Sequence, residues 1–172
     1  KIKNNILSSW QKFLPGMAVW IHDHGLDAAL NVENYRTSKF KHINNYEKKK
    51  WLPYYQGVTR CPGCSNDCIK IYSHDNNKLD KRSCGIHQQI MGSLGPNIGT
   101  KKPEEVLFFN HLVNQYGLDP VSHGFVLSFA MEIYEKKIIT KKDTGGLDLS
   151  FGNFNSAVEM TLNIINRKNF GN

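Results

Sequence analysis

Apolar residues recur at helical spacing through most of the second half of this 172-residue chain. The pattern covers residues 103–116, 120–137 and 156–168. Pro103 is typical of a first helical turn, and Gly117 stands where the end of a helix needs a positive φ. Ser156 and Glu159 have the spacing of a capping box, so we expect the third helix to begin at Ser156. These patterns predict three helices and a mainly α fold.

Patterns in the first half of the chain are shorter. Residues 3–14 have helical spacing, and residues 17–31 favour a helix on each side of a turn. Residues 31–50 are polar and irregular, which indicates a connector. Residues 69–72 alternate like a short strand and lead into a turn at residues 73–77. We therefore expect a helical, bundle-like domain with a small irregular or β-ribbon segment.

Composition and charge favour a globular protein without a nucleic-acid or membrane partner. The chain is 40% hydrophobic and 11% aromatic, which is typical of a globular protein. Its net charge of +7 comes partly from lysines in residues 39–50 and 136–142. Because these lysines are dispersed among other residues and no nucleic-acid motif accompanies them, a solvated surface is favoured over nucleic-acid binding. With no apolar run of transmembrane length and no signal-peptide pattern in residues 1–5, we expect a cytoplasmic protein without a membrane partner.

Three cysteines form the most specific motif. Cys61, Cys64 and Cys68 make a CxxCxxxC run, with Gly63 in its first loop. Three thiols within eight residues can converge on one inorganic centre, and their unequal spacing favours an iron–sulfur cluster over the paired CxxC motifs of zinc sites. A zinc-binding structural module, or cysteines that are buried or joined in disulfides, are the alternatives. A 4Fe-4S cluster needs a fourth ligand, which would be Cys84 or a residue outside this chain.

Histidines are the other candidate metal ligands. His22 and His24 flank Asp23, a combination that favours a loop when no helix aligns the two rings. His111 and His123 lie in the predicted helices, where a lone histidine among apolar residues favours a hydrogen-bonded core position over a ligand.

Three segments behind the cysteine motif resemble the aldehyde ferredoxin oxidoreductase family of tungsten enzymes. They are LGPNIG at residues 94–99, NQYGLDPVS at residues 114–122 and FAMEIYE at residues 129–135. The resemblance runs from about Tyr35 to the last residue, and residues 35–40 are similar to the segment that leads out of the family's pterin-holding domain. It implies a fragment from the middle to the C-terminal half of a family member. Residues 1–50 would then be a connector and the end of a preceding domain, and residues 51–172 an incomplete helical domain that contacts a cluster and a pterin.

The resemblance also implies cluster ligands. Cys61, Cys64 and Cys68 would be three ligands of a 4Fe-4S cluster, and the family's fourth ligand belongs to a later region. In the other large class of pterin enzymes, which also opens with CxxCxxxC, Cys84 would be the fourth ligand. The GLD and LGPN segments argue against that class.

The implied pterin contacts fall in the segment between two of the predicted helices. The family motif DxxGLD, which holds a pterin, falls on Asn114, Leu118 and Asp119. Since Asn114 replaces an acid, the Asp119 carboxylate is expected to be the stronger contact. A glutamate near the tungsten of the aldehyde enzymes falls on Gln89, which cannot exchange protons, so the catalytic residues stay unassigned. The metal-binding ExxH motif of some members would fall on residues 108–111, where a phenylalanine replaces the glutamate, and no interface metal is expected.

The function implied by the resemblance is that of one part of an enzyme. A tungsten (or molybdenum) bis-pterin would oxidise an aldehyde with water to a carboxylic acid, and the 4Fe-4S cluster would pass the electrons to ferredoxin or a similar carrier. The partners would be a small aldehyde-type substrate, the remainder of the enzyme on the same or another chain, and a second copy in a homodimer. The alternative is a stand-alone iron–sulfur electron-transfer subunit.

Overall fold

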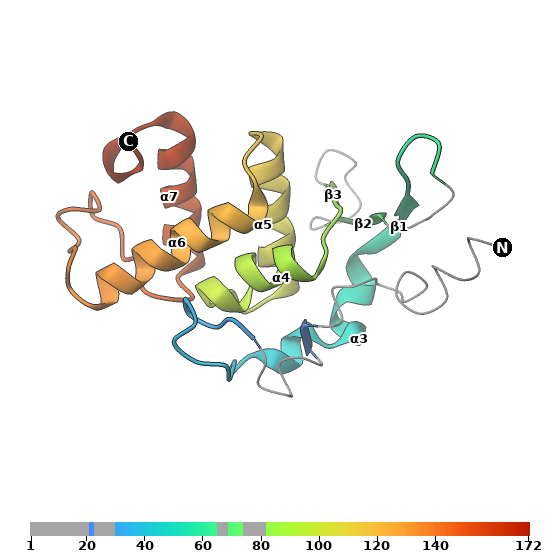
Figure 1. Cartoon of the computed structure of the whole chain (residues 1–172), viewed down its shortest axis with the longest axis horizontal. Helices are drawn as coiled ribbons and strands as arrows, with labels where there is room; N and C mark the ends of the chain where they lie inside the picture. Colours follow the sequence, from blue (N-terminus) through green and yellow to red (C-terminus); the bar gives the residue numbers. More distant parts are fainter. Residues whose placement is uncertain (1–20, 23–29, 65–68, 74–81) are drawn as a thin grey trace.

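The computed structural model describes residues 21–22, 30–64, 69–73 and 82–172, with the backbone alone for residues 82–84 (Figure 1). The helix predicted at residues 3–14, most of the pair predicted at residues 17–31, Cys68 and His24 lie outside the described residues. The described helices and strands, with η for a short 3-10 helix, are η2 (Ile43–Tyr46), α3 (Lys48–Trp51), η3 (Leu52–Tyr54), β1 (Tyr55–Thr59), β2 (Ile69–Ser73), β3 (Arg82–Cys84), α4 (Gln88–Leu94), η5 (Pro96–Ile98), α5 (Pro103–Gln115), α6 (Pro120–Glu135), α7 (Phe154–Asn166) and η6 (Asn169–Gly171).

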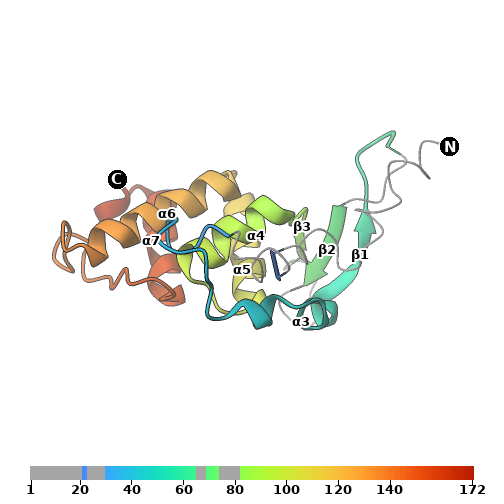
Figure 2. The same ribbon diagram turned by 60° about the horizontal axis from the view of Figure 1, so that its bottom comes forward.

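Helices α4 to α7 make up one end of the molecule, and the small sheet lies toward the other end (Figures 1 and 2). Helix α6 packs closely on α4, because Gly124 has no side chain to separate them: a Cβ at Gly124 would lie 2.6 Å from the carbonyl oxygen of Ser93. The helices predicted at residues 103–116 and 120–137 are confirmed as α5 and α6. The mainly α fold class is confirmed as well. No helix in the described part of the chain is long and apolar enough to cross a membrane.

Helix α7 begins two residues before the predicted start. Its N-cap is Asn153, whose side-chain oxygen accepts a hydrogen bond from the backbone N–H of Ser156 at 3.3 Å. Asparagine is among the best N-cap residues because its carbonyl oxygen reaches the free N–H groups of the first turn. Ser156 therefore lies inside the first turn, and the expectation that the helix begins at Ser156 is wrong.

The sheet has three antiparallel strands in the order β1-β2-β3. The strand predicted at residues 69–72 is confirmed as β2, which lies in the centre and pairs with both neighbours. Thr59 pairs with Ile69, so residues 60–68, which include the cysteine motif, connect β1 to β2. Cys84 pairs with Ile71 at the end of β3.

Residues 30–51 contribute to the same hydrophobic core as the helices. An aromatic series runs from Phe40 through Tyr46 and Trp51 to Tyr72 of the sheet, with ring centroids 5.7 to 6.0 Å apart. All four side chains are buried. The parts of the chain on both sides of residue 50 thus share one hydrophobic core.

A tight loop anchors this segment to α6. Asn34 donates from its side chain to Glu132 and accepts from the hydroxyl of Ser128 at 3.1 Å. Ser128 in turn accepts from the buried side chain of Asn97 at 2.9 Å. Because buried polar groups are costly unless they are paired, this network selects one position for the loop.

Candidate functional site

The described part of the cysteine motif is a tight turn. The backbone N–H of Cys64 donates to the carbonyl oxygen of Cys61 at 3.0 Å, and Gly63 has φ of 74°. Proline at the second position and glycine at a third position with positive φ are the residues that a type II turn requires. Cys61 is exposed and Cys64 is half-buried. A turn of this kind brings its first and fourth residues together, so it suits the first two ligands of a metal centre.

The remaining cysteines are less fully defined. Cys68 lies outside the described residues, and only the backbone of Cys84 is described. Since a strand rises by about 3.3 Å per residue, the pairing of Cys84 with Ile71 places its backbone about 7 Å along β2 from Ile69. Among the side chains that the structure describes, no three His, Cys, Asp or Glu residues converge on one point. The ligand set of Cys61, Cys64 and Cys68 therefore stays a prediction.

The start of α4 lies at the same end of the sheet as the cysteine turn. Strand β1 runs toward the turn, β2 runs away from it and β3 runs back. The backbone N–H of Gly85 donates to the carbonyl oxygen of Lys70 at 3.2 Å, which extends this pairing to the segment before α4. Figure 2 shows the end of β1 and the start of α4 on this same side. Gln89, the position of the family glutamate, is exposed in the first turn of α4.

The turn between α5 and α6 carries the predicted pterin contacts, and two backbone hydrogen bonds hold it in place. The N–H of Gly117 donates to the carbonyl of Asn114 at 3.1 Å, and that of Leu118 donates to the carbonyl of Val113 at 2.9 Å. These two bonds define a Schellman motif, with the left-handed residue Gly117 at φ of 69°. The predicted positive φ of Gly117 is confirmed.

Asp119 then begins the next helix. It is the N-cap of α6, and its carboxylate accepts from the backbone N–H of Ser122 at 2.7 Å. Hydrogen bonds from that N–H and from the hydroxyl of Ser122 hold the pKa of Asp119 below its ordinary value. The exposed carboxylate is therefore ionised at neutral pH and can accept hydrogen bonds from a ligand.

His87 is a neighbour of Asp119 that the sequence patterns did not single out. Its Nδ1 accepts from the backbone N–H of Gln89 at 3.2 Å, so the imidazole caps α4. Burial lowers the pKa of His87, while a separate hydrogen bond with the side chain of Gln89 and the charge of Asp119 act in the opposite direction. The structure thus brings the first turn of α4 close to the carboxylate at the start of α6. A histidine directly ahead of a helix is a weak capping signal, which explains why it was missed.

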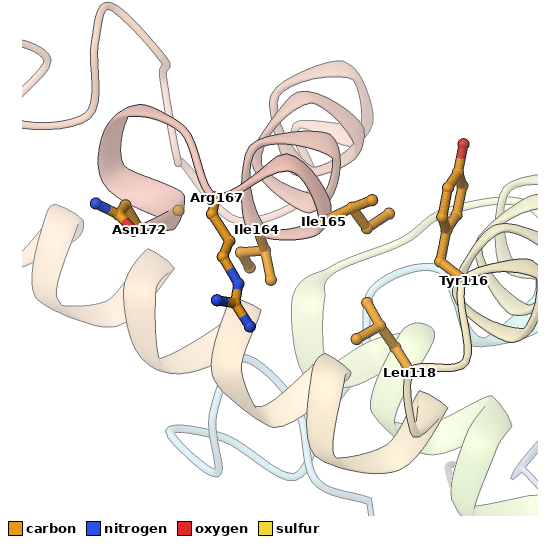
Figure 3. Close-up of a pocket in the computed structure, with 7 residues that line it drawn as sticks. Tyr116, Leu118, Ile164, Ile165, Arg167 and Asn172 are labelled. Atoms are coloured by element: carbon orange, nitrogen blue, oxygen red, sulfur yellow. The ribbon is translucent and has the colours of Figure 1, made fainter.

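Asn114 and Leu118 face different surroundings. The side-chain nitrogen of Asn114 donates to the backbone oxygen of Asn110 at 2.6 Å and to its side-chain oxygen at 3.0 Å. Leu118 lines a cavity of about 650 Å³ between the α5–α6 turn and the end of α7, where Ile164 and Arg167 lie opposite it (Figure 3). Asp119 is not among the described residues that line this cavity. The three predicted contacts thus lie close in the chain without pointing into one hollow.

The described helical histidines do not form a metal centre. His123 is buried, its Nε2 lies 2.9 Å from the hydroxyl of Thr161 on α7, and burial lowers its pKa to about 4. The interpretation of His123 as a hydrogen-bonded core residue is confirmed. His111 is half-buried on α5 and belongs to no cluster of ligand-type side chains in the described part of the chain.

Comparisons with known proteins agree with the site residues in pointing to one family. The family model described as "Aldehyde ferredoxin oxidoreductase, domains 2 & 3" matches residues 11–172, so the match begins before the start near Tyr35 that the resemblance predicted. The tungsten-containing aldehyde ferredoxin oxidoreductase of Pyrococcus abyssi is 34% identical over 156 residues, which is 88% of this chain and 24% of that protein. The aliphatic sulfonate oxidoreductase, WOR-like subunit, of Pyrococcus furiosus is 27% identical over 152 residues, or 87% of this chain and 24% of that protein.

A solved structure shares the fold. It is the active site complex BamBC of benzoyl coenzyme A reductase with 1,5-dienoyl-CoA, with a TM-score of 0.70 and 20% identity over 91% of this chain and 24% of that chain. The chain thus spans about a quarter of the length of these relatives. Because the family model covers all but its first residues, the chain belongs to the aldehyde ferredoxin oxidoreductase family.

Proposed function

We propose that this chain is part of a tungstopterin (or molybdopterin) iron–sulfur oxidoreductase that converts an aldehyde and water to a carboxylic acid. Ferredoxin or a similar carrier would accept the electrons from a 4Fe-4S cluster, in the cytoplasm. The observation that carries the proposal is the α5–α6 turn. Its Schellman glycine and its helix-capping Asp119 give a structural reason for two positions of the family's DxxGLD pattern.

The residues present fit both cofactors. Asp119 is an exposed, ionised acceptor for the amino and ring N–H groups of a pterin, and Asn114 offers an amide in place of the family's acid. Cys61 and Cys64 stand at the two ends of a tight turn, where a cluster would find two thiolates and Cys68 would supply the third. When bound, the metal–pterin centre supplies the two-electron redox chemistry and the cluster supplies one-electron transfer.

Gln89 cannot act as a general acid or base at the position of the family glutamate. An amide side chain can donate and accept hydrogen bonds but cannot carry a proton in exchange with the substrate. The role of Gln89 in this proposal is therefore to orient a substrate oxygen or a water molecule at the start of α4. The relative named as an aliphatic sulfonate oxidoreductase subunit indicates that family members differ in substrate.

The relatives also support an assembly. One of them is named as a subunit and the solved structure is a complex, which supports a partner that completes the cofactor cavity on the same or another chain. A homodimer is a further proposal. The alternative, a stand-alone electron-transfer subunit, would differ from this enzyme in its cofactors: it would hold an iron–sulfur cluster without tungsten or pterin.

The test uses the complete protein that contains this chain. We expect tungsten or molybdenum, iron and pterin in the purified protein, and aldehyde-dependent reduction of ferredoxin or a viologen dye. Asp119→Asn should lower the pterin content, whereas Asp143→Asn should not. Asp143 is a matched control because it is an exposed carboxylate that accepts a backbone hydrogen bond, from Thr140 at 2.8 Å, away from the candidate site. A complete protein with iron but without pterin would replace this proposal with the electron-transfer subunit.

A further inference from the structure

A second cavity lies on the side of the chain where residues 32–42 meet the end of η5. It has a volume of about 410 Å³ and is bordered by seven residues of the segment 32–42, by Gly99 and Lys101, and by Phe151. Lys39, Lys41 and Lys101 line it. The residues that border it include neither Gln89 nor Asp119, so it is separate from the proposed pterin contacts.

The charges around this cavity are unbalanced. Three lysines line it against one carboxylate, Glu33, which pairs with Arg36 at 3.5 Å. In the described part of the chain, no ion pair joins Lys39, Lys41 or Lys101 to a carboxylate. Lysines gathered around a concave surface raise the local concentration of anions, and a lysine ammonium suits the charge of a phosphate.

The walls of the cavity are set by the fold. Val32 and Thr37 form an isolated bridge, and the N–H of Glu33 donates to the carbonyl of Pro96 at 3.1 Å, which attaches this segment to η5. On the other side, Gly99 has φ of 77°, and a Cβ there would lie 2.7 Å from the backbone nitrogen of Gly152. This close approach holds the neighbouring Phe151 at the rim. The lysines therefore extend from backbone segments that are held by this β-bridge, this hydrogen bond and this close approach of two glycines.

Apolar side chains also line the cavity, together with Thr37 and His42. Val32 and Phe40 are buried residues of the lining, and the guanidinium of Arg36 lies over the half-buried ring of Phe151, 5.3 Å from its centroid. An anion with an apolar part would cover this surface in addition to meeting the charges. An inorganic anion would use the charges alone.

We propose that this cavity is a binding site for an organic phosphate. The phosphate oxygens meet Lys39, Lys41 and Lys101, and the organic part lies against Phe40 and Phe151. The inference does not depend on the proposed oxidoreductase function, because none of these residues belongs to the cysteine turn or the α5–α6 turn.

Calorimetric titration of the complete protein with phenyl phosphate and with inorganic phosphate tests the proposal. We expect phenyl phosphate to bind more tightly, and Lys39→Gln and Lys101→Gln each to weaken it by about fivefold or more, since each removes a charge-assisted contact. Glu33→Gln should strengthen binding because it removes the opposing charge. Lys142→Gln, which changes an exposed lysine that does not line the cavity, should leave the affinity unchanged.

Acetylation of lysines, followed by mass spectrometry, gives a second measurement on the unmodified sequence. Phenyl phosphate should protect Lys39, Lys41 and Lys101 and leave Lys142 reactive. Equal protection of all lysines, equal affinity for both probes, or no effect of Lys39→Gln and Lys101→Gln would overturn the proposal. So would protection of the three lysines before any phosphate is added, since another segment of the protein would then fill the cavity.

Discussion

The carboxylate of Asp119 accepts a hydrogen bond from the backbone N–H of Ser122 at 2.7 Å. The residue that the resemblance assigns to pterin binding is therefore also the residue that begins α6. The Schellman motif at Gly117 ends α5 two residues earlier, so the backbone between the two helices has little freedom. Helix capping thus holds the candidate ligand in place before any cofactor binds.

Asp119→Asn separates capping from cofactor binding. Asparagine is as good an N-cap as aspartate, so we expect the melting temperature of the complete protein to stay close to that of the wild type. Pterin content should fall, because the charged acceptor is lost and charge-assisted hydrogen bonds are the stronger ones. The fall should exceed that caused by Asn114→Ala. Equal cofactor losses in the two variants would remove Asp119 from the site.

Gly117→Ala tests backbone strain at the same turn. A Cβ at Gly117 would meet nothing within 4 Å, so the cost arises from the positive φ alone and should be about 1 kcal/mol in the free energy of unfolding. Gly124→Ala is the matched comparison, because there the φ is ordinary and the clash with Ser93 is severe. We expect Gly124→Ala to be the more destabilising in urea denaturation. The opposite order would contradict the packing of α4 on α6.

Protonation of His123 should set the stability in mild acid. Burial lowers its pKa from 6.5 to about 4, so the unfolded chain takes up the proton first as the pH falls. The contribution of His123 to the free energy of unfolding is therefore fully present above pH 6.5 and decreases between pH 6.5 and 4, by about 3 kcal/mol. Urea denaturation across this range measures the decrease.

His123→Gln is the control for this pH dependence. Glutamine can keep a hydrogen bond to Thr161 and does not titrate, so the decrease in stability should become shallower. His87, whose pKa is also lowered by burial, contributes in the same direction and accounts for part of what remains. An unchanged pH dependence in His123→Gln would show that other groups are responsible.

Reconstitution of the 172-residue chain with iron and sulfide shows which cysteines are needed to hold the cluster. Cys61→Ser and Cys64→Ser should each abolish the brown charge-transfer absorption, because both thiols belong to the tight turn. Cys84→Ser should leave it, since the resemblance places the family's fourth cluster ligand in a later region of the sequence. With three ligands the cluster should be a three-iron or labile four-iron species by EPR. A stable four-iron cluster that Cys84→Ser destroys would instead favour the self-contained electron-transfer subunit.

The sequence by itself determined the features that depend on near neighbours. The helical spacing of apolar residues predicted α5 and α6, and the position of Gly117 predicted its left-handed φ. The start of α7 was missed because Asn153 and Ser156 are both good N-cap residues, and the sequence pattern favoured the second. The cysteine spacing and the segments at residues 94–99, 114–122 and 129–135 led to the family for the same reason, because each of them is a contiguous motif.

Tertiary structure alone decided the relationships between distant residues. Residues 31–50 look polar and irregular in sequence, yet Phe40 and Tyr46 are buried in the core that the helices share. Their burial depends on which surfaces meet, and a period of two or 3.6 residues carries no information about that. The approach of His87 to Asp119, and the gathering of Lys39 and Lys101 around one cavity, likewise arise from chain reversals. Long-range contacts position these charged side chains. Their positions could not be predicted from the sequence, because no local pattern records which segments pack together.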